Sequence, residues 1–238
     1  MICTPRALRR CPIKQLLLPV IILFHVFEVA QILRCHSSPV DEFVTRRSER
    51  VYIASIHWNN EKILRSHWND AVIALADALG RENVFITIYE SGSWDDSKGA
   101  LSELDTALAV RDIRRNIILS QTTHLDEISV TETGSGWIDT PRGRRELRRI
   151  PYLSRLRNWT LLPLQELARQ GEQFDTVLFL NDVVFNADDV FRLLSTNDGD
   201  FAAACSLDFH HPPQLYDTFA LRDAEGHEPL MQTWPARD

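Results

Sequence analysis

The sequence has few of the features that mark the best-known protein classes. Its 238 residues include only four cysteines, which is too few for a scaffold built on disulfides. It has no Walker loop, no paired cysteine clusters and no Gly-x-Ser-x-Gly nucleophile elbow. A net charge of -7 argues against general nucleic-acid binding. These absences direct attention to the long hydrophobic run and to the acidic residues.

The longest hydrophobic run lies near the N-terminus. Residues 15–33 are mostly apolar, and the run is long enough to cross a bilayer. Four basic residues precede it and only Arg34 directly follows it, so the positive-inside rule predicts a cytosolic N-terminus. A cleaved signal peptide is the alternative, but the run is long for one and no clear small-x-small cleavage site follows. We expect a cytosolic basic head (1–14), a transmembrane signal anchor (15–33), a stem (34–50) and a lumenal domain (51–238).

The lumenal domain alternates short apolar runs with helical patterns, which is typical of an α/β fold with a mostly parallel sheet. The expected strands are 51–56, 84–89, 116–119, 177–180 and 200–205. The expected helices are one from Asn60 as N-cap to Gly80, then 98–110, one through an arginine-rich region to Arg169, and 187–194. A sequon, Asn158-Trp159-Thr160, lies in the arginine-rich helix.

The stretch 174–191 carries the strongest functional signal. The apolar run Val177–Leu180 predicts a central strand covered on both faces. Asn181 and Asp182 stand where this run stops. A carboxylate at the C-terminal end of a buried strand lies at the edge of an open α/β sheet where ligands bind. Asp182 is therefore a candidate ligand for a divalent cation, and the open alternative is that it caps a turn.

Acids and amides also follow other expected strands. They are Asn59, Glu90, Asp95 and Asp208. Such oxygen ligands suit Mg²⁺ or Mn²⁺, and either ion can stabilise a nucleotide diphosphate as a leaving group. For a membrane-anchored lumenal domain, we interpret the pattern as transfer of a sugar from a nucleotide donor. The arginine-rich helix suggests an anionic ligand, although most of its arginines are better explained as a solvated surface.

Six segments of the lumenal domain resemble those of a known family. They are Ile53–Glu61, Ile88–Asp95, Tyr152–Asn158, Phe179–Phe185, Ala204–Phe209 and Tyr216–Asp223. The blocks Glu-Ser-Gly-Ser-Trp-Asp (90–95) and Leu-Asn-Asp-Val (180–183) are the most specific. On these segments the chain, from about Val51 to Pro235, resembles the fungal capsule-associated α-1,3-mannosyltransferases of glycosyltransferase family 69.

The resemblance implies a GT-A-like (Rossmann-like) fold, a GDP-mannose donor, a mannoside or polysaccharide acceptor, and dependence on Mn²⁺ or Mg²⁺. It also implies a single-pass type II Golgi membrane protein with its catalytic domain in the lumen. Asp182 would bind the metal, where GT-A enzymes carry Asp-x-Asp. The expected donor-binding residues are Asn59, Glu90, Asp95, Arg157 and Asn181. Transfer to an α-1,3 product would proceed with retention, which requires no general base, and Asp208 and Asp217 are the candidate catalytic residues on the acceptor side.

Two other functions remain as alternatives. Family members generally continue beyond the Trp-Pro at 234–235, so the domain is expected to be truncated at its C-terminus. A catalytically incomplete lumenal membrane protein could instead serve polysaccharide synthesis or export as a partner. A metal-dependent phosphohydrolase is disfavoured, because the sequence offers no clustered set of ligands for two metals.

Overall fold

The protein was analysed as a computed structural model with two units, Met1–Glu42 and Phe43–Asp238. The described residues are 19, 22–27, 29–30, 49–122, 126, 136–139, 141, 143, 145–211, 214–216 and 227. In the first unit the described residues are helical and exposed. Among all described residues, no helix combines the length and the apolar character that a membrane crossing requires. The expected anchor (15–33) lies partly outside the described residues.

The second unit is built on four parallel strands in the order β3-β2-β1-β6. They are β1 (Val51–His57), β2 (Val84–Glu90), β3 (Arg114–Leu119) and β6 (Thr176–Phe179). Val51 pairs with Val84 on one side and with Thr176 on the other. The expected parallel sheet is therefore confirmed, and β1 and β2, the most deeply buried strands, lie at its centre.

The prediction that 177–180 forms a central strand covered on both faces is wrong for the described sheet. β6 lies at the edge of the four strands, and the Val177 side chain is 47% exposed. The physical reason is that an apolar run of four residues indicates β-propensity and partial burial. It does not indicate how many strands lie beside it in the sheet.

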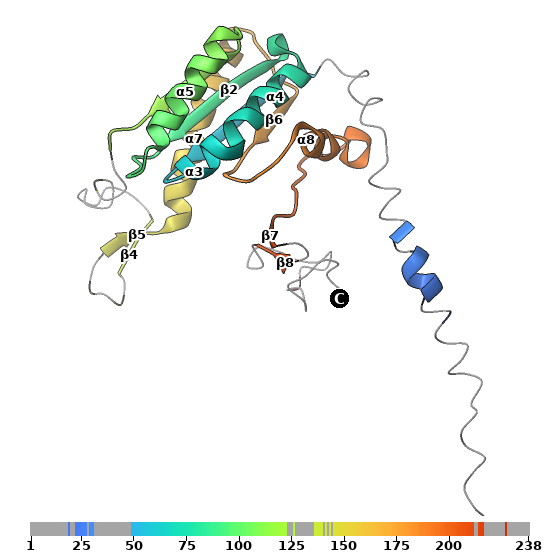
Figure 1. Ribbon diagram of the computed structural model, residues 1–238. Coiled ribbons are helices and arrows are strands. Elements are labelled where there is room, and N and C mark those ends of the chain that lie inside the picture. The colour runs from blue at the N-terminus through green and yellow to red at the C-terminus, as the bar shows by residue number, and fades with distance from the viewer. Residues whose placement is uncertain are drawn as a thin grey trace, which may run out of the picture. The chain divides into compact units, whose positions relative to one another are not determined.

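Helices cover both faces of this sheet (Figure 1). On one face lie α3 (Glu61–Ile63), the π-helical turn η1 (Leu64–Trp68), α4 (Asn69–Leu79) and α5 (Ser97–Val110), and on the other face lies α7 (Arg149–Arg169). Trp68, Val72 and Leu75 are completely buried, as their three- and four-residue spacing predicts. Gly80 ends α4 with a φ of +88°, a backbone conformation that glycine adopts without strain.

The remaining elements are short. They are η2 (Arg81–Asn83), β4 (Trp137–Asp139), β5 (Arg145–Leu147), α8 (Ala187–Leu194), η3 (Thr196–Gly199), β7 (Phe209–His211) and β8 (Gln214–Leu215). α8 begins at the expected residue, and Asn186 and Asp189 form a capping box there. The predicted strand 200–205 is wrong, because these residues form no strand and are mostly exposed. Its three alanines have low β-propensity, and no described strand lies beside them to pair with.

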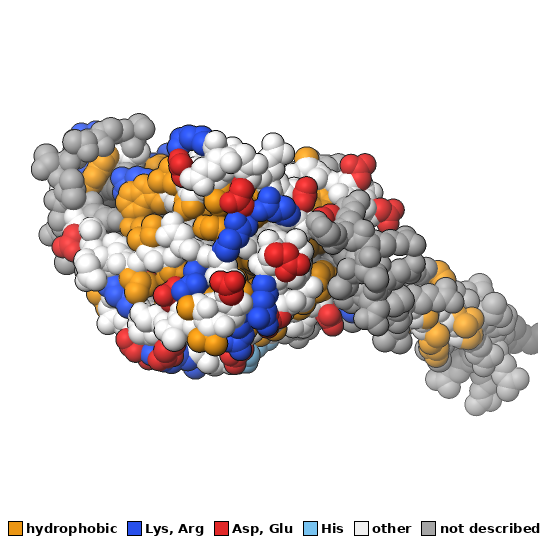
Figure 2. Space-filling model, turned by 90° about the horizontal axis from the view of Figure 1, so that it is seen from above, with side chains coloured by type: hydrophobic (Ala, Val, Ile, Leu, Met, Phe, Trp, Pro, Cys, Tyr) orange, Lys and Arg blue, Asp and Glu red, His pale blue; other side chains and the backbone are white. Residues whose placement is uncertain are grey.

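Ion pairs join the strands at the amino end of the sheet. Glu172 accepts hydrogen bonds from Arg50 and Arg114 at 2.7 Å each, and the bonds from Arg114 and then Arg50 hold its pKa below the ordinary value. The Arg50 guanidinium also lies 4.9 Å from the centre of the Phe174 ring. Figure 2 shows acidic and basic side chains interspersed on the face seen from above. Since these pairs are partly exposed, each adds little stability.

Candidate functional site at the carboxyl end of the sheet

The carboxyl ends of β1, β2 and β6 lie at one edge of the sheet because the strands are parallel. His57, the last residue of β1, pairs with Glu90, the last residue of β2. Beyond the strands, the Ser91 amide donates to the His57 carbonyl at 2.9 Å and the Leu180 amide donates to the Ala54 carbonyl at 2.9 Å. The three following loops therefore leave the sheet side by side, in the arrangement that places ligand sites in open α/β folds.

Three side chains hold the residues that follow β6. The Ser55 hydroxyl donates to the Leu180 carbonyl at 2.8 Å, and the Trp68 indole N–H donates to the Asn181 carbonyl at 3.0 Å. Asn60 Nδ2 donates to Asp182 Oδ2 at 2.8 Å. Each residue from 180 to 182 thus accepts a hydrogen bond from a side chain of β1 or of the segment that follows β1. The exposed Asp182 carboxylate is bonded by Asn60 from across the site and not from within its own turn.

Asn60 has a different role from the one predicted. It stands before α3, but its side chain makes no capping bond to that helix. Its Oδ1 instead accepts from the Trp58 amide at 2.9 Å while its Nδ2 binds Asp182. Competition from these two partners explains why the residue at an N-cap position does not act as a cap.

His57 is a buried residue behind Asp182 that the sequence analysis did not select. Its ring packs edge-on against Trp68, with centroids 4.5 Å apart. Because the Ser55 hydroxyl donates to Leu180, it accepts from His57 Nε2 at 2.8 Å, so Nε2 carries the hydrogen. Among the described residues, the buried Nδ1 has no hydrogen-bond partner. Burial lowers the pKa of His57, and the negative charge of Asp182 raises it by a smaller amount, so the pKa is about 4. The ring is therefore neutral at pH 7.

Two of the expected donor-binding residues join the loops after β1 and β2. The Asn59 amide donates to Ser93 Oγ at 2.8 Å, and the Trp94 amide donates back to Asn59 Oδ1 at 2.8 Å. Asp95 accepts from the Ser97 hydroxyl at 2.6 Å and from the Glu61 amide at 3.0 Å. Burial raises the pKa of Asp95, but its hydrogen bonds, first that of Ser97, outweigh burial and leave the pKa below its ordinary value.

The other two expected donor-binding residues outside the β6 loop, Glu90 and Arg157, come from different elements, β2 and α7. Glu90 is completely buried, accepts from the Ser93 amide, and faces Lys98 Nζ at 3.7 Å. Arg157 is exposed on α7, with its guanidinium 5.6 Å from the centre of the Phe179 ring on β6. In this conformation Glu90 shapes the loop after β2, and Arg157 covers the edge strand.

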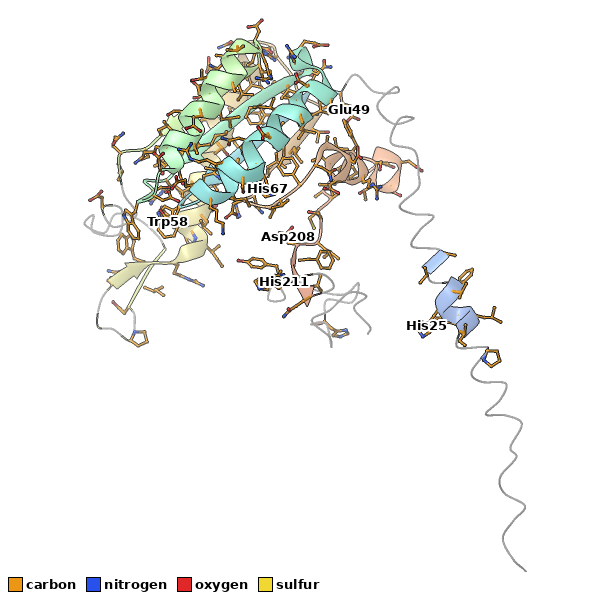
Figure 3. All side chains as sticks on the ribbon, in the orientation of Figure 1. His25, Glu49, Trp58, His67, Asp208 and His211 are labelled. Atoms are coloured by element: carbon orange, nitrogen blue, oxygen red, sulfur yellow. The ribbon has the colours of Figure 1, made fainter. Side chains whose placement is uncertain are left out.

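An open cleft of about 1000 Å³ lies beside Asp182. Its polar lining includes Asn181, Asp182, Asp189, Arg192 and Asp208, and its apolar lining includes Val184, Leu207, Phe209 and Tyr216. Asn181, Asp182 and Asp208 are therefore brought together as candidates, with Asp208 just before β7 (Figure 3). Asn59, Glu90, Asp95 and Arg157 do not line the cleft. Asp217 lies outside the described residues.

The carboxylates in this cleft suit one type of metal site. Within the described ranges, no group of three or more His, Cys, Asp or Glu side chains is arranged to hold a metal ion. A complete protein cage is therefore not formed by these residues. Mg²⁺-type ions are commonly held by one or two carboxylates together with water and substrate phosphates. Asp182 is the residue on this cleft that could hold such an ion, with a donor supplying part of the coordination.

The fold and this edge define a parallel α/β protein with a candidate ligand site at the carboxyl end of its sheet. The sequence matches the family model of cryptococcal mannosyltransferase 1 over residues 50–237. The chain therefore belongs to this family of glycosyltransferases. Residues Val51 to Pro235, which carry the resemblance in the sequence, lie within the matched range.

Comparison with individual proteins gives no close relative among the curated proteins and a distant one among the solved structures. No curated protein matches this sequence. Among solved structures, the crystal structure of Staphylococcus aureus TarS 1-349 is similar with a TM-score of 0.34 and 12% sequence identity. The alignment covers 69% of this chain and 41% of that chain. The chain thus spans less than half of the solved protein that it matches.

Proposed function

We propose that the protein transfers mannose from GDP-mannose to a mannoside or polysaccharide acceptor, forming an α-1,3 linkage with retention. The proposal is supported by the match to the mannosyltransferase family and by a cleft that begins at Asp182, at the carboxyl end of the sheet. The observation that carries it is the hydrogen bond from Asn60 to Asp182, because it fixes a carboxylate where the sheet presents its ligand-binding edge.

Asp182 would hold Mn²⁺ or Mg²⁺ together with the donor. When bound, the cation neutralises charge that develops on the departing diphosphate. Asp182 supplies a carboxylate whose position is set by Asn60, while Ser55 and Trp68 hold the two preceding carbonyls. A carboxylate that is already positioned loses little conformational freedom when the cation and the donor bind.

The acceptor would enter from the side of the cleft formed by residues 206–216. Leu207, Phe209 and Tyr216 give this side apolar surface, and Asp208 gives it a carboxylate. Such a mixture can contact both the C–H face and the hydroxyl groups of a sugar ring. Asp208 and Asp217 would accept hydrogen bonds from acceptor hydroxyl groups, and with retention neither has to act as a general base. The proposed setting is the Golgi lumen, with residues 15–33 as the anchor.

The direct test is transfer of radiolabelled mannose from GDP-mannose to an α-linked mannoside in the presence of Mn²⁺. Asp182→Asn keeps the size of the side chain and removes its charge, and we expect a loss of at least about 100-fold in transfer. Asp188→Asn is the matched control, because Asp188 is exposed in the first turn of α8 and does not line the cleft.

Equal transfer by the wild type and Asp182→Asn would remove Asp182 from catalysis. Absence of transfer from the wild type, with donor and acceptor both varied, would favour the alternative role as a non-catalytic partner in polysaccharide synthesis or export.

A further inference from the structure

Two exposed tryptophans lie in contact at the carboxyl end of the sheet, outside the residues that line the cleft. Trp58 is 42% exposed and Trp94 is 64% exposed, and their ring centroids are 5.4 Å apart at an interplanar angle of 69°. They come from the loops after β1 and β2, and Figure 3 labels Trp58 at the start of α3. Single exposed apolar side chains are ordinary, but two large aromatic rings in contact form a surface that can bind a ligand.

The backbone of this Trp58–Trp94 pair is held firmly. The Trp58 amide donates to Asn60 Oδ1 at 2.9 Å, and the Trp94 amide donates to Asn59 Oδ1 at 2.8 Å. Asn59 has a φ of +53°, a conformation that is unfavourable for most side chains and recurs at functional sites. The two rings therefore stand on loops whose backbone is held in place. Binding of a ligand would not require these loops to become ordered.

The charges around the pair indicate the chemistry of that ligand. Glu61, Asp95 and Asp96 lie near the two tryptophans in the sequence, and so do the basic residues Lys62, Arg65 and Lys98. The nearby Arg65 is already engaged by Asp96 at 2.5 Å and by Glu61 at 3.4 Å, and it also contacts Glu103. Charges that are balanced and already paired offer a phosphate group little net attraction, whereas an uncharged sugar ring can place its C–H face on an indole and its hydroxyl groups near acceptors.

We propose that the Trp58–Trp94 pair is a binding site for uncharged pyranose rings of the glycan acceptor. The identity of these rings as mannose rests on the proposed function. Asn60 joins this site to the cleft, since it accepts from the Trp58 amide and donates to Asp182. Units of the acceptor away from the reacting end would bind at the pair, which keeps a longer chain near the cleft.

The test uses the full chain with 5-fluorotryptophan in place of its six tryptophans and follows ¹⁹F signals assigned by single Trp→Phe variants. On titration with linear α-linked mannotriose, we expect the signals of Trp58 and Trp94 to shift and that of the buried Trp68 to stay. Trp94→Ala should weaken mannotriose binding about 10-fold. Val110→Ala is the matched control, because Val110 is 81% exposed at the far end of α5, about 20 Å along the helix.

Several results would overturn the inference. They are signals that stay fixed up to saturating mannotriose, shifts caused by GDP and not by mannotriose, and unchanged binding in Trp94→Ala. Transfer of mannose to a short acceptor is measured on the same preparations. Transfer without a mannotriose-dependent shift contradicts the Trp58–Trp94 site alone, while the shift without transfer supports this site and contradicts the proposed function.

Discussion

The loops after β1 and β2 and the segment from Asp182 to Tyr216 both border the candidate site, yet they are held in place by different means. The first two loops leave strands that are buried at all but one residue each, and they are tied together by bonds of Asn59, Asp95 and Asn60. The segment from 182 to 216 is mostly exposed, and outside α8 its regular structure consists of η3 and the short strands β7 and β8.

This difference separates two tasks that a transferase has to perform. The fixed loops suit contacts that must be held in advance, namely the bond from Asn60 to Asp182 and the proposed acceptor site at Trp58 and Trp94, because positions set in advance reduce the cost of ordering them. A region with few buried contacts can adapt to acceptors of different shape, as binding loops on rigid scaffolds commonly do. Mutations in the buried region should therefore lower the free energy of unfolding more than mutations in the exposed segment.

The largest effect is expected at Trp68. Its indole is completely buried against His57 and donates to the Asn181 carbonyl, so Trp68→Ala should lower the free energy of unfolding by about 3–5 kcal/mol. Leu207→Ala, in the exposed segment with 39% of its side chain accessible, should cost less than about 1 kcal/mol. Chemical denaturation followed by circular dichroism measures both, and equal losses would contradict the proposed difference between the regions.

A smaller effect, confined to acidic pH, is expected from His57. The folded state holds its pKa at about 4, below the value of about 6.5 in an unfolded chain. The unfolded chain therefore takes up the proton first as the pH falls. The stability that His57 contributes is complete above pH 6.5 and declines towards pH 4, by about 3 kcal/mol in total.

Comparing denaturation of the wild type and His57→Phe between pH 4 and pH 7 isolates this contribution. The difference in stability between the two proteins should change across that range and stay constant above it. A parallel pH dependence for both would show that His57 titrates normally in the folded protein.

The smallest effect is expected at Asn186, on the exposed side. Its side chain accepts from the Asp189 amide at 3.0 Å, and its own amide donates to the Asp189 carboxylate at 3.0 Å. Asn186→Ala should cost about 1 kcal/mol, while Asn186→Ser should retain most of the cap. Thermal unfolding of the wild type, Asn186→Ala and Asn186→Ser measures these losses. A loss in Asn186→Ala as large as that in Trp68→Ala would mean that the exposed segment is as tightly held as the buried region.

The sequence predicted the buried region well. The bounds of β1, β2 and α5 follow from apolar periodicity to within one residue, because every buried side chain here adds to one continuous core. The helix expected from Asn60 to Gly80 is divided by the π-helical turn η1, which the periodicity did not predict. The prediction was wrong at 200–205, where alanines supply hydrophobicity without β-propensity, and for the central position of β6, which depends on pairing with distant strands.

The candidate site could be predicted only in part. Asp182 follows β6 as expected, whereas the strand expected before Asp208 does not form; both residues line the cleft. The supporting residues Ser55, His57 and Trp68 were missed as a group. Each belongs to an element whose pattern is explained by core packing. Only the three-dimensional structure shows that Ser55 and Trp68 bond the residues that precede Asp182 and that His57 bonds Ser55.

Binding of GDP with and without Mn²⁺ tests the central claim most directly, because it does not depend on the acceptor. By equilibrium dialysis, Mn²⁺ should tighten GDP binding about 10-fold or more in the wild type and in Asp188→Asn, since the cation joins the diphosphate to Asp182. In Asp182→Asn this gain should be absent. An equal gain in Asp182→Asn, or no gain in the wild type, would contradict a cation site at Asp182.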